Sequence, residues 1–163
     1  MLQSYNKEQA ILRINRLSEQ GKEFVFIIDY LQDCSYIEET NRLDSSFVLY
    51  NLNGFTNQDS IFPLRKTAVQ WNIDFPPFDQ YKPSFDYVLE NIRGGNSFLT
   101  NLTYRTPVTT NLSLKEIFYH SKAMYKLWLK DAFVVFSPEI FVRINGTLIS
   151  SYPMKGTIDA TLP

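Results

Sequence analysis

The sequence contains a single cysteine, Cys34, so the chain cannot form an internal disulfide, and it fits a reducing compartment. The single histidine, His120, stands beside Ser121 without an acidic residue in a recognisable motif. We therefore expect a packed or solvated helix residue rather than a member of a catalytic triad. A glycine-rich phosphate loop is missing, and so is any His, Cys, Asp or Glu spacing typical of a metal site. The sequence favours none of the common nucleotide, zinc or triad chemistries.

An excess of charge of one sign is also missing, because 16 basic and 17 acidic residues are mixed along the chain and give a net charge of −1. Without a basic stripe to neutralise phosphates, nucleic acid is not an expected partner. The longest hydrophobic runs, Phe24–Ile28 and Ala132–Phe136, are far too short to span a bilayer. Met1–Leu17 has no apolar signal core. We expect a soluble cytoplasmic protein with neither a membrane nor a nucleic-acid partner.

The composition that remains is that of a globular domain, with 44% hydrophobic and 20% charged residues. A length of 163 residues suffices for one ordinary domain, and we expect residues 1–163 to form a single one. The aromatic share is high, at 15%. These rings either fill the space between packed layers or line a ligand cleft, and composition does not decide between the two.

Hydrophobic periodicity predicts a helix near the beginning of the chain, with Ser4 or Asn6 as its cap and Gly21 as its stop. Its apolar residues at helical spacing are Ala10, Ile11, Ile14 and Leu17. Strands are expected at three β-rich runs, which are Phe24–Tyr30, a short one around Tyr36-Ile37, and Phe47–Leu52. Residues 63–82 carry prolines among scattered aromatics, which predicts irregular or extended chain.

A second helix is predicted from Pro83, since the first helical turn tolerates proline, to the glycine pair at 94–95. A strand is expected from Asn96 to Arg105. The capping box from Ser113 to Glu116 predicts a third helix, and we expect this helix to run towards Tyr125.

The last part of the chain predicts strands at Phe133–Phe136, Phe141–Ile144 and Thr147–Ser150. Asn145-Gly146 separates the last two runs. An Asn-Gly pair between β-rich runs is the strongest short hairpin signal, because both turn residues need positive φ. Clusters of strands with helices between them indicate an α+β fold.

Two residues, Lys155 and Glu139, have neighbours that suit chemistry. Pro153 stiffens the chain before Lys155 and Gly156 permits a close approach to the backbone, whereas Glu139 stands among apolar residues. Burial would raise the pKa of the carboxyl and lower the pKa of the amine, which suits a general acid and a nucleophile. A neutral amine at pH 7 costs roughly 4–5 kcal/mol unless burial or a nearby cation supplies it. Spacing alone also fits a solvated loop lysine and a charge at a strand edge, so both interpretations stay open.

Three motifs follow one another in residues 94–162, namely Gly-Gly-Asn-Ser-Phe-Leu-Thr-Asn-Leu-Thr at 94–103, Phe-Ser-Pro-Glu at 136–139, and Pro-Met-Lys-Gly-Thr at 153–157. In this order they resemble the first half of the chorismate-binding domain of the aminodeoxychorismate synthase component I family. Met154 replaces the isoleucine of that family's Pro-Ile-Lys-Gly-Thr signature. Glu139 and Lys155 are 16 positions apart, which is also the family's spacing. Residues 1–93 fit less distinctly than the motif-bearing segment 94–163.

The resemblance implies a role for each matching residue. Lys155 would attack C2 of chorismate and displace the C4 hydroxyl, with Glu139 as general acid or base. Ammonia from a glutamine amidotransferase subunit would then add at C4 and release 4-amino-4-deoxychorismate for folate and p-aminobenzoate synthesis. Asn101, Gly156 and Thr157 correspond to positions near the substrate.

The family's fold is a two-sheet sandwich flanked by helices, and its domain is roughly twice as long as this chain. The resemblance therefore implies an N-terminal half, with the C-terminal half outside the chain. The family's Mg²⁺-binding glutamates and the groups that hold the substrate carboxylates belong to that other half. We accordingly expect no metal ligands in this chain and no activity from the chain alone.

Two alternatives remain. The first is a non-catalytic chorismate-binding or interaction module of the same ancestry, whose exposed apolar faces form a partner interface or lead to self-association. The second is anthranilate synthase component I. That family typically carries a small residue at the position of Lys155, so the lysine argues against it.

Overall fold

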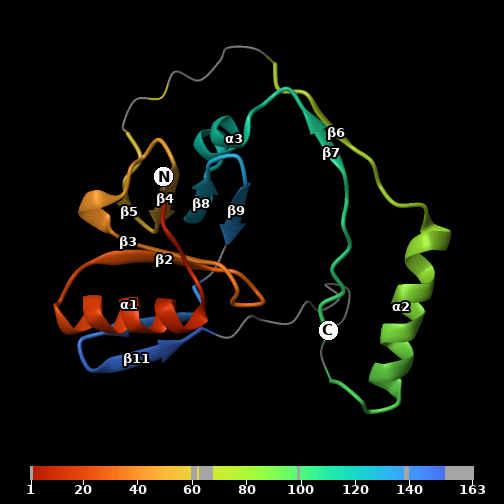
Figure 1. Ribbon diagram of the computed structural model, residues 1–163. Helices are drawn as coiled ribbons and strands as arrows, with labels where there is room; N and C mark the ends of the chain where they lie inside the picture. The colour runs from red at the N-terminus through yellow and green to blue at the C-terminus, as the bar shows by residue number, and fades with distance from the viewer. Residues whose placement is uncertain (1, 60–61, 63–67, 99, 138–139, 153–163) are drawn as a thin grey trace. The chain divides into compact units, whose positions relative to one another are not determined.

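A computed structural model describes residues 2–59, 62, 68–98, 100–137 and 140–152 of the chain. Its elements in chain order are β1 (Ser4–Tyr5), α1 (Lys7–Glu19), β2 (Phe24–Ile28), β3 (Ser35–Glu39), η1 (Thr40–Arg42), β4 (Val48–Leu52), β5 (Phe55–Thr56), β6 (Trp71–Ile73), α2 (Phe78–Arg93), β7 (Val108–Thr110), α3 (Leu114–His120), β8 (Tyr125–Leu129), β9 (Phe133–Ser137), β10 (Val142–Asn145) and β11 (Leu148–Ser151) (Figure 1). They divide into two units, residues 1–64 with 114–163, and residues 65–113.

Local signals explain α1, which begins and ends as the sequence predicts. The Asn6 side chain accepts a hydrogen bond from the Gln9 N–H at 3.0 Å, and the Gln9 side chain accepts one from the Asn6 N–H at 3.2 Å. This reciprocal capping box satisfies two backbone donors at the start of the helix. Gly21, with φ of 61°, supplies the left-handed turn after its end.

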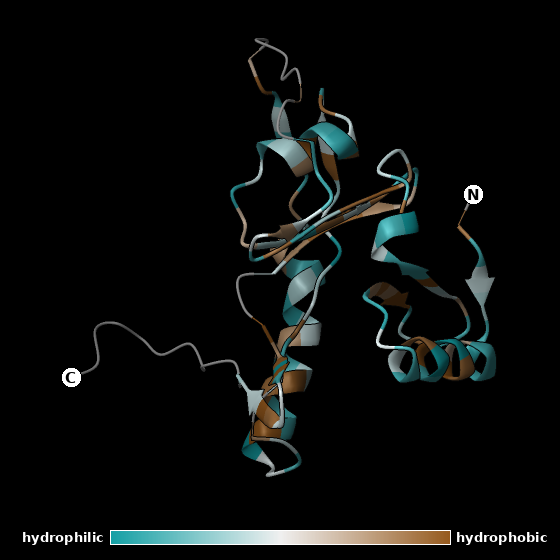
Figure 2. Cartoon of the chain, turned by 90° about the vertical axis from the view of Figure 1, so that its left-hand side faces the viewer, coloured by the Kyte–Doolittle hydropathy of each residue, from teal (hydrophilic) through white to brown (hydrophobic). Residues whose placement is uncertain are grey.

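The apolar stripe of α1 (Figure 2) packs on an antiparallel sheet with the strand order β1-β3-β2. The buried cluster consists of Ala10, Leu17 and Ile37, with Tyr5, Ile14 and Phe24 packed around it. Helix and sheet therefore bury one shared core, which stabilises the first part of the chain.

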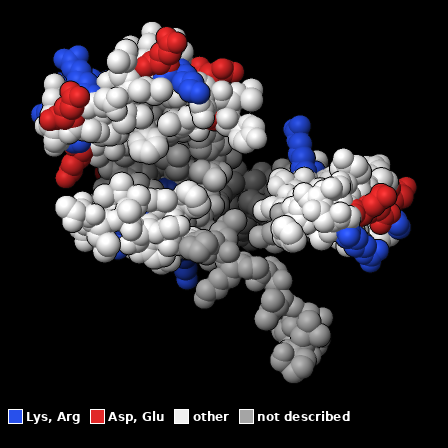
Figure 3. Space-filling model, turned by 90° about the horizontal axis from the view of Figure 1, so that it is seen from below, with Lys and Arg blue, Asp and Glu red and all other residues white. Residues whose placement is uncertain are grey.

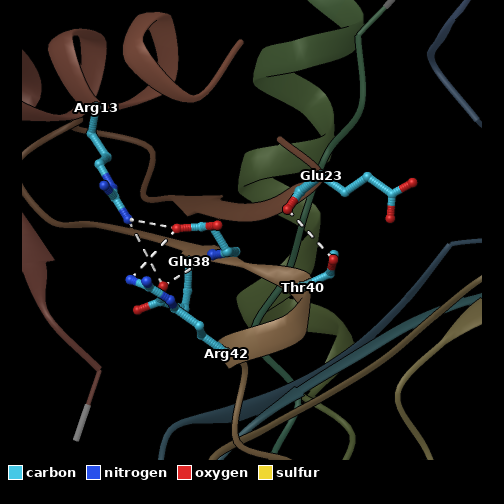
Figure 4. A network of polar contacts seen from close by, with 6 residues as sticks. Arg13, Glu23, Glu38, Thr40 and Arg42 are labelled. Atoms are coloured by element: carbon cyan, nitrogen blue, oxygen red, sulfur yellow. Dashed lines mark hydrogen bonds and ion pairs between the residues drawn. The ribbon is translucent and has the colours of Figure 1, made fainter. Parts of the chain in front are cut away.

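An ion-pair network joins α1 to the end of β3 (Figure 4). The Arg13 guanidinium lies 3.9 Å from carboxylate oxygens of both Glu38 and Glu39. Arg42 approaches Glu39 from the other side at 3.6 Å. Glu39 is only 8% exposed, and these two cations balance its buried charge.

A second antiparallel sheet has the strand order β5-β4-β8-β9. Its first two strands are joined at Asn53-Gly54, where both residues have positive φ, at 53° and 98°. Positive φ at both positions of a two-residue turn is the type I′ hairpin geometry. The core on this sheet consists of Leu49, Phe118 and Trp128, so α3 covers one face of β4 and β8.

The predicted hairpin near residue 146 is confirmed, with its turn one residue later than expected. Asn145 pairs with Leu148 inside the β10–β11 ladder, so Gly146 and Thr147 form the turn. Positive φ occurs at Gly146, at 58°, and not at Asn145. Glycine at the first turn position is the type II′ arrangement, which needs only one positive φ.

The second unit corrects two predictions. Helix α2 begins at Phe78, directly after its N-cap Pro77, rather than at Pro83, which lies inside the helix. Lys82 and Asp86, which flank this proline in the sequence, form an ion pair that supports this turn of the helix. The strand expected from Asn96 to Arg105 does not form in the described part of that segment. A strand needs a hydrogen-bonded partner strand. The ladder in this unit joins β6 to β7, and residues 96–105 belong to neither strand.

Helix α3 starts after Ser113, as predicted, but ends at His120. Tyr125, expected near the end of this helix, is instead the first residue of β8. The ladder with β4 on one side and β9 on the other outweighs the local helical pattern there. His120 is exposed at the helix end, in keeping with the expected solvated histidine.

The mixture of helices with antiparallel strands confirms the expected α+β class. Lys and Arg side chains stand among Asp and Glu side chains on the face drawn in Figure 3, as the mixed charge order of the sequence predicts. Among the described helices, none is both long and apolar enough to cross a bilayer.

Candidate functional site

Four of the five predicted site residues, Glu139, Lys155, Gly156 and Thr157, lie outside the described residues. The structure does describe the chain that flanks them. Glu139 directly precedes Ile140, and Lys155 follows Tyr152 by three positions. For these four residues, the structure therefore gives the geometry of the neighbouring chain.

The β10–β11 hairpin brings the two flanks together. Its ladder pairs Val142 with Ser151, and the Tyr152 N–H then donates a hydrogen bond to the Phe141 carbonyl at 2.9 Å. The chain therefore enters and leaves the hairpin at the same end. On one side it comes from Glu139, and on the other it leads to Lys155. Residues 16 positions apart in sequence thus flank one structural feature.

A cavity of about 630 Å³ lies along this hairpin, from Ile140 and Tyr152 at its open end to Asn145 beside its turn. Its lining residues are Leu52, Asn53, Phe55, Tyr125, Ile140, Arg143, Ile144, Asn145 and Tyr152. Ile140 directly follows Glu139 and Tyr152 precedes Lys155 by three positions, so described chain that flanks the two predicted catalytic residues forms part of the cavity wall. The volume lies within the range of small-molecule sites, and apolar walls with a few polar groups are typical of them.

Arg143 is the only charged side chain among the described residues that line this cavity. Strand β10 places it opposite Ser150 of β11. A cation at this position favours the neutral form of a nearby amine and attracts an anionic ligand. Tyr125, Asn53 and Asn145 add groups able to form hydrogen bonds.

Asn101, the fifth predicted site residue, lies in the second unit and is exposed. It immediately precedes Leu102 and Thr103, which line a separate cavity of about 800 Å³ in that unit. Arg105 and Asp74 supply charges of opposite sign to the same cavity. Asn101 therefore directly precedes chain that lines this cavity, and its own side chain is exposed.

Lys126 is a buried cation with a structural role, since it is 6% exposed. Its Nζ donates hydrogen bonds to the carbonyls of Phe118 at 2.9 Å and Ser121 at 3.0 Å. These carbonyls lie at the C-terminal end of α3, where a cation is favourable. Burial lowers the pKa of Lys126.

Metal ligands were not expected in this chain. Within the described ranges, no three His, Cys, Asp or Glu side chains lie close enough together to hold a metal ion. These residues therefore do not fit the Mg²⁺ site that the family resemblance implies, and no step of the chemistry below is derived through the metal.

Sequence reasoning missed the residues that line the hairpin cavity. Arg143 interrupts an apolar strand pattern, which is the signal by which it could have been found. Asn53 belongs to an Asn-Gly pair between β4 and β5, and this pair is the hairpin signal by which Asn53 could have been found. Tyr125 was assigned to a helix, so its place beside the cavity could not be anticipated.

Comparison with known proteins gives two consistent findings. The sequence profile of one family, described as chorismate binding enzyme, matches residues 18–162. An uncharacterised PabA-like protein of Haemophilus influenzae is 40% identical over 156 residues, which are 96% of this chain and 47% of that protein. A second PabA-like protein, from Pasteurella multocida, is 37% identical over 164 aligned positions, covering 94% of this chain and 47% of the relative.

The chain therefore spans about half the length of the curated relatives it matches. No solved structure matches it.

Proposed function

The chain belongs to the chorismate binding enzyme family, and from this premise we propose that it is the nucleophile-bearing half of an enzyme that aminates chorismate at C4. One observation carries the proposal. The β10–β11 hairpin brings the segment after Glu139 and the segment before Lys155 to one end, beside a cavity of about 630 Å³. The PabA-like names of both relatives are in keeping with p-aminobenzoate synthesis.

The proposed reaction begins with the neutral amine of Lys155. Its nitrogen forms a bond to C2 of chorismate while both ring double bonds shift, from C1=C2 to C1=C6 and from C5=C6 to C4=C5, and the C4–O bond breaks. Glu139 supplies the proton with which the C4 hydroxyl leaves as water. Ammonia then adds at C4, both double bonds shift back to C1=C2 and C5=C6, and the C2–N bond breaks to release Lys155. The balance is chorismate and ammonia to 4-amino-4-deoxychorismate and water.

Arg143 supports this chemistry electrostatically. A lysine has an ordinary pKa of about 10.4, so a nucleophilic amine needs a neighbour that disfavours its charged form. We propose that the Arg143 guanidinium, which lines the cavity, is that neighbour. Because chorismate carries two carboxylates, the same cation also favours its approach.

The remaining expectations belong to the same proposal. Asn101, Gly156 and Thr157 contribute to substrate binding, and a glutamine amidotransferase subunit supplies ammonia. Mg²⁺ is held by residues of the relatives' other half. The whole domain is a two-sheet sandwich flanked by helices, and this chain forms its first half. Lys155 stands against the anthranilate synthase alternative, in which a small residue is typical at this position.

Product analysis tests the proposal. The chain is co-expressed with the part of the Haemophilus influenzae relative that lies outside the match, and the preparation receives chorismate, ammonium and Mg²⁺. Chromatography should detect 4-amino-4-deoxychorismate, and Glu139→Gln should slow its formation by about 100-fold, the typical contribution of a general acid.

Lys155→Ala should form no product in this assay, and Lys22→Ala, at an exposed lysine in the same unit, serves as the control. Release of anthranilate in place of the amino product would contradict C4 amination. Undiminished turnover by Lys155→Ala would contradict the role of the lysine.

A further inference from the structure

The sequence contains two Asn-Gly pairs, Asn53-Gly54 between β4 and β5 and Asn145-Gly146 between β10 and β11. An asparagine followed by glycine is prone to deamidation, because the glycine nitrogen attacks the asparagine side-chain carbonyl and no Cβ blocks its approach. On sequence alone the two pairs are equally reactive. The structure separates them by the hydrogen bonding of the glycine nitrogen.

At the first pair, the attacking nitrogen is held in a hydrogen bond. The Gly54 N–H donates to the Asn51 side-chain oxygen at 2.9 Å. The Asn53 N–H donates to the Met124 carbonyl at 2.8 Å, which fixes the chain just before the turn. Attack on Asn53 therefore requires that the Gly54 bond break first, and breaking it costs free energy.

At the second pair, the attacking nitrogen is accessible. Gly146 is exposed, and its N–H has no hydrogen-bond partner among the residues that the structure describes. Asn145 is also exposed and ends β10, where its pairing with Leu148 is the last of the ladder. A two-stranded hairpin without a buried residue opens at low cost, so Asn145 can leave its extended conformation and bring its side chain to the Gly146 nitrogen.

We propose that Asn145 is a site of spontaneous deamidation and that Asn53 is protected from it. The Gly146 nitrogen forms a bond to Cγ of Asn145 while the bond from Cγ to the side-chain nitrogen breaks, and ammonia leaves with the proton of the Gly146 N–H. Water then adds to either carbonyl of the resulting succinimide ring and opens it to aspartate or isoaspartate. Water is the only co-reactant.

The modification adds a negative charge to the wall of the hairpin cavity. Asn145 and Arg143 both line this cavity, and residues two positions apart on a strand point to the same face. An aspartate has an ordinary pKa of about 3.9, so the new carboxylate is ionised at neutral pH and competes with an anionic ligand for Arg143.

This consequence rests on the proposed function. In the product assay described above, Asn145→Asp should raise the KM for chorismate and change kcat little. An unchanged KM would contradict the consequence for the cavity.

Peptide mapping of the aged chain tests the site itself. The purified 163-residue chain is incubated at mildly alkaline pH, and mass spectrometry follows both Asn-Gly peptides with time. The Asn145 peptide should deamidate about 10-fold faster than the Asn53 peptide, the factor that one hydrogen bond of about 1.4 kcal/mol supplies. Its products should include isoaspartate, which direct hydrolysis of the amide does not give.

Asn51 offers a matched pair of variants. Asn51→Ala removes the acceptor of the Gly54 N–H, so it should accelerate deamidation at Asn53 and leave the rate at Asn145 unchanged. Asn51→Asp keeps an acceptor oxygen at the same position and should leave both rates as in the parent chain. In urea, where neither turn persists, the two peptides should react at similar rates.

Three results would overturn the inference: equal rates at the two sites in the folded chain, a faster reaction at Asn53, or a preference for Asn145 that persists in urea. Failure of the proposed function gives a different pattern. In that case Asn145 deamidates and Asn53 is protected, but the assay of the co-expressed halves yields no 4-amino-4-deoxychorismate.

Discussion

Lys126 shows how a single buried cation holds two elements together. Its side chain extends from β8, and its Nζ bonds to two carbonyls at the end of α3, at 2.9 and 3.0 Å. The same ammonium lies 4.4 Å from the centre of the Phe118 ring. The residue therefore links the helix end to the central strand of the second sheet, next to the core residue Phe118.

Lys126→Met should lower the free energy of unfolding by about 1–3 kcal/mol, because the variant leaves a buried carbonyl without a donor. Urea denaturation measures the change. Lys122→Met is the control, since Lys122 is exposed and its replacement should alter stability by less than about 0.5 kcal/mol. Equal stability of the two variants would contradict the linking role.

The difference in unfolding free energy between Lys126→Met and the parent chain should depend on pH. Burial lowers the pKa of Lys126, so the unfolded chain binds more protons than the folded chain between that pKa and the usual value near 10.4. Stability contributed by this group therefore rises with pH in that window. The deficit of Lys126→Met relative to the parent should grow as the pH rises towards 10, and a deficit that shrinks would contradict the pKa direction.

Elements specified by nearby residues were predicted well from the sequence. Helix α1 has its cap at Asn6, its apolar spacing and its stop at Gly21 within one short segment. The β10–β11 hairpin has its turn signal between its own strands, so its position was correct to within one residue. Such elements need no knowledge of distant partners.

Strand β8 was not predicted, because its evidence lies elsewhere in the chain. Its partners are β4 and β9, and its inward positions include Lys126 as well as Trp128. A lysine at a core-facing position hides the alternation that normally marks a strand. The fold could be predicted where the signal is local, and not where a ladder decides between helix and strand.

The start of α2 can be tested at Pro83. In the structure this proline lies in the helix interior, where it removes a hydrogen bond and clashes with the preceding turn. Pro83→Ala should therefore stabilise α2 by up to about 3 kcal/mol and increase the protection of its first turns from hydrogen exchange. If the helix instead started at Pro83, the substitution Pro83→Ala would gain little stability, since proline is favoured at the first helical position.

Pro77→Ala is the control, because Pro77 is the N-cap residue and lies outside the helical turns. It should have little effect on exchange from the helix interior. Unchanged protection in Pro83→Ala would favour the later start that the sequence predicts.

At the scale of the whole molecule, the order of three motifs indicated the family, and the match over residues 18–162 confirms it. The hairpin between the two motif-bearing segments was predicted from its own turn signal, and the structure added the cavity beside it with Arg143 in the cavity wall. Neither the cavity nor the place of Arg143 could be derived from spacing, because both depend on how residues distant in the sequence pack together. The catalytic roles of Lys155 and Glu139 stay predictions, since both residues lie outside the described part of the chain.

The β10–β11 hairpin exposes apolar side chains on both of its faces. Ile144 and Ile149 are paired and share one face, whereas Leu148 lies on the other. All three are at least 66% exposed.

Intact mass spectrometry tests the central claim, covalent catalysis by Lys155, most directly. The co-expressed halves are incubated with chorismate and Mg²⁺ without ammonia, so that the adduct has no amine to complete the reaction. The 163-residue chain should gain the mass of chorismate less one water, peptide mapping should place it on Lys155, and Lys155→Ala should gain nothing. A gain that persists in Lys155→Ala, or amination with ammonia by a chain that never carries an adduct, would contradict the account.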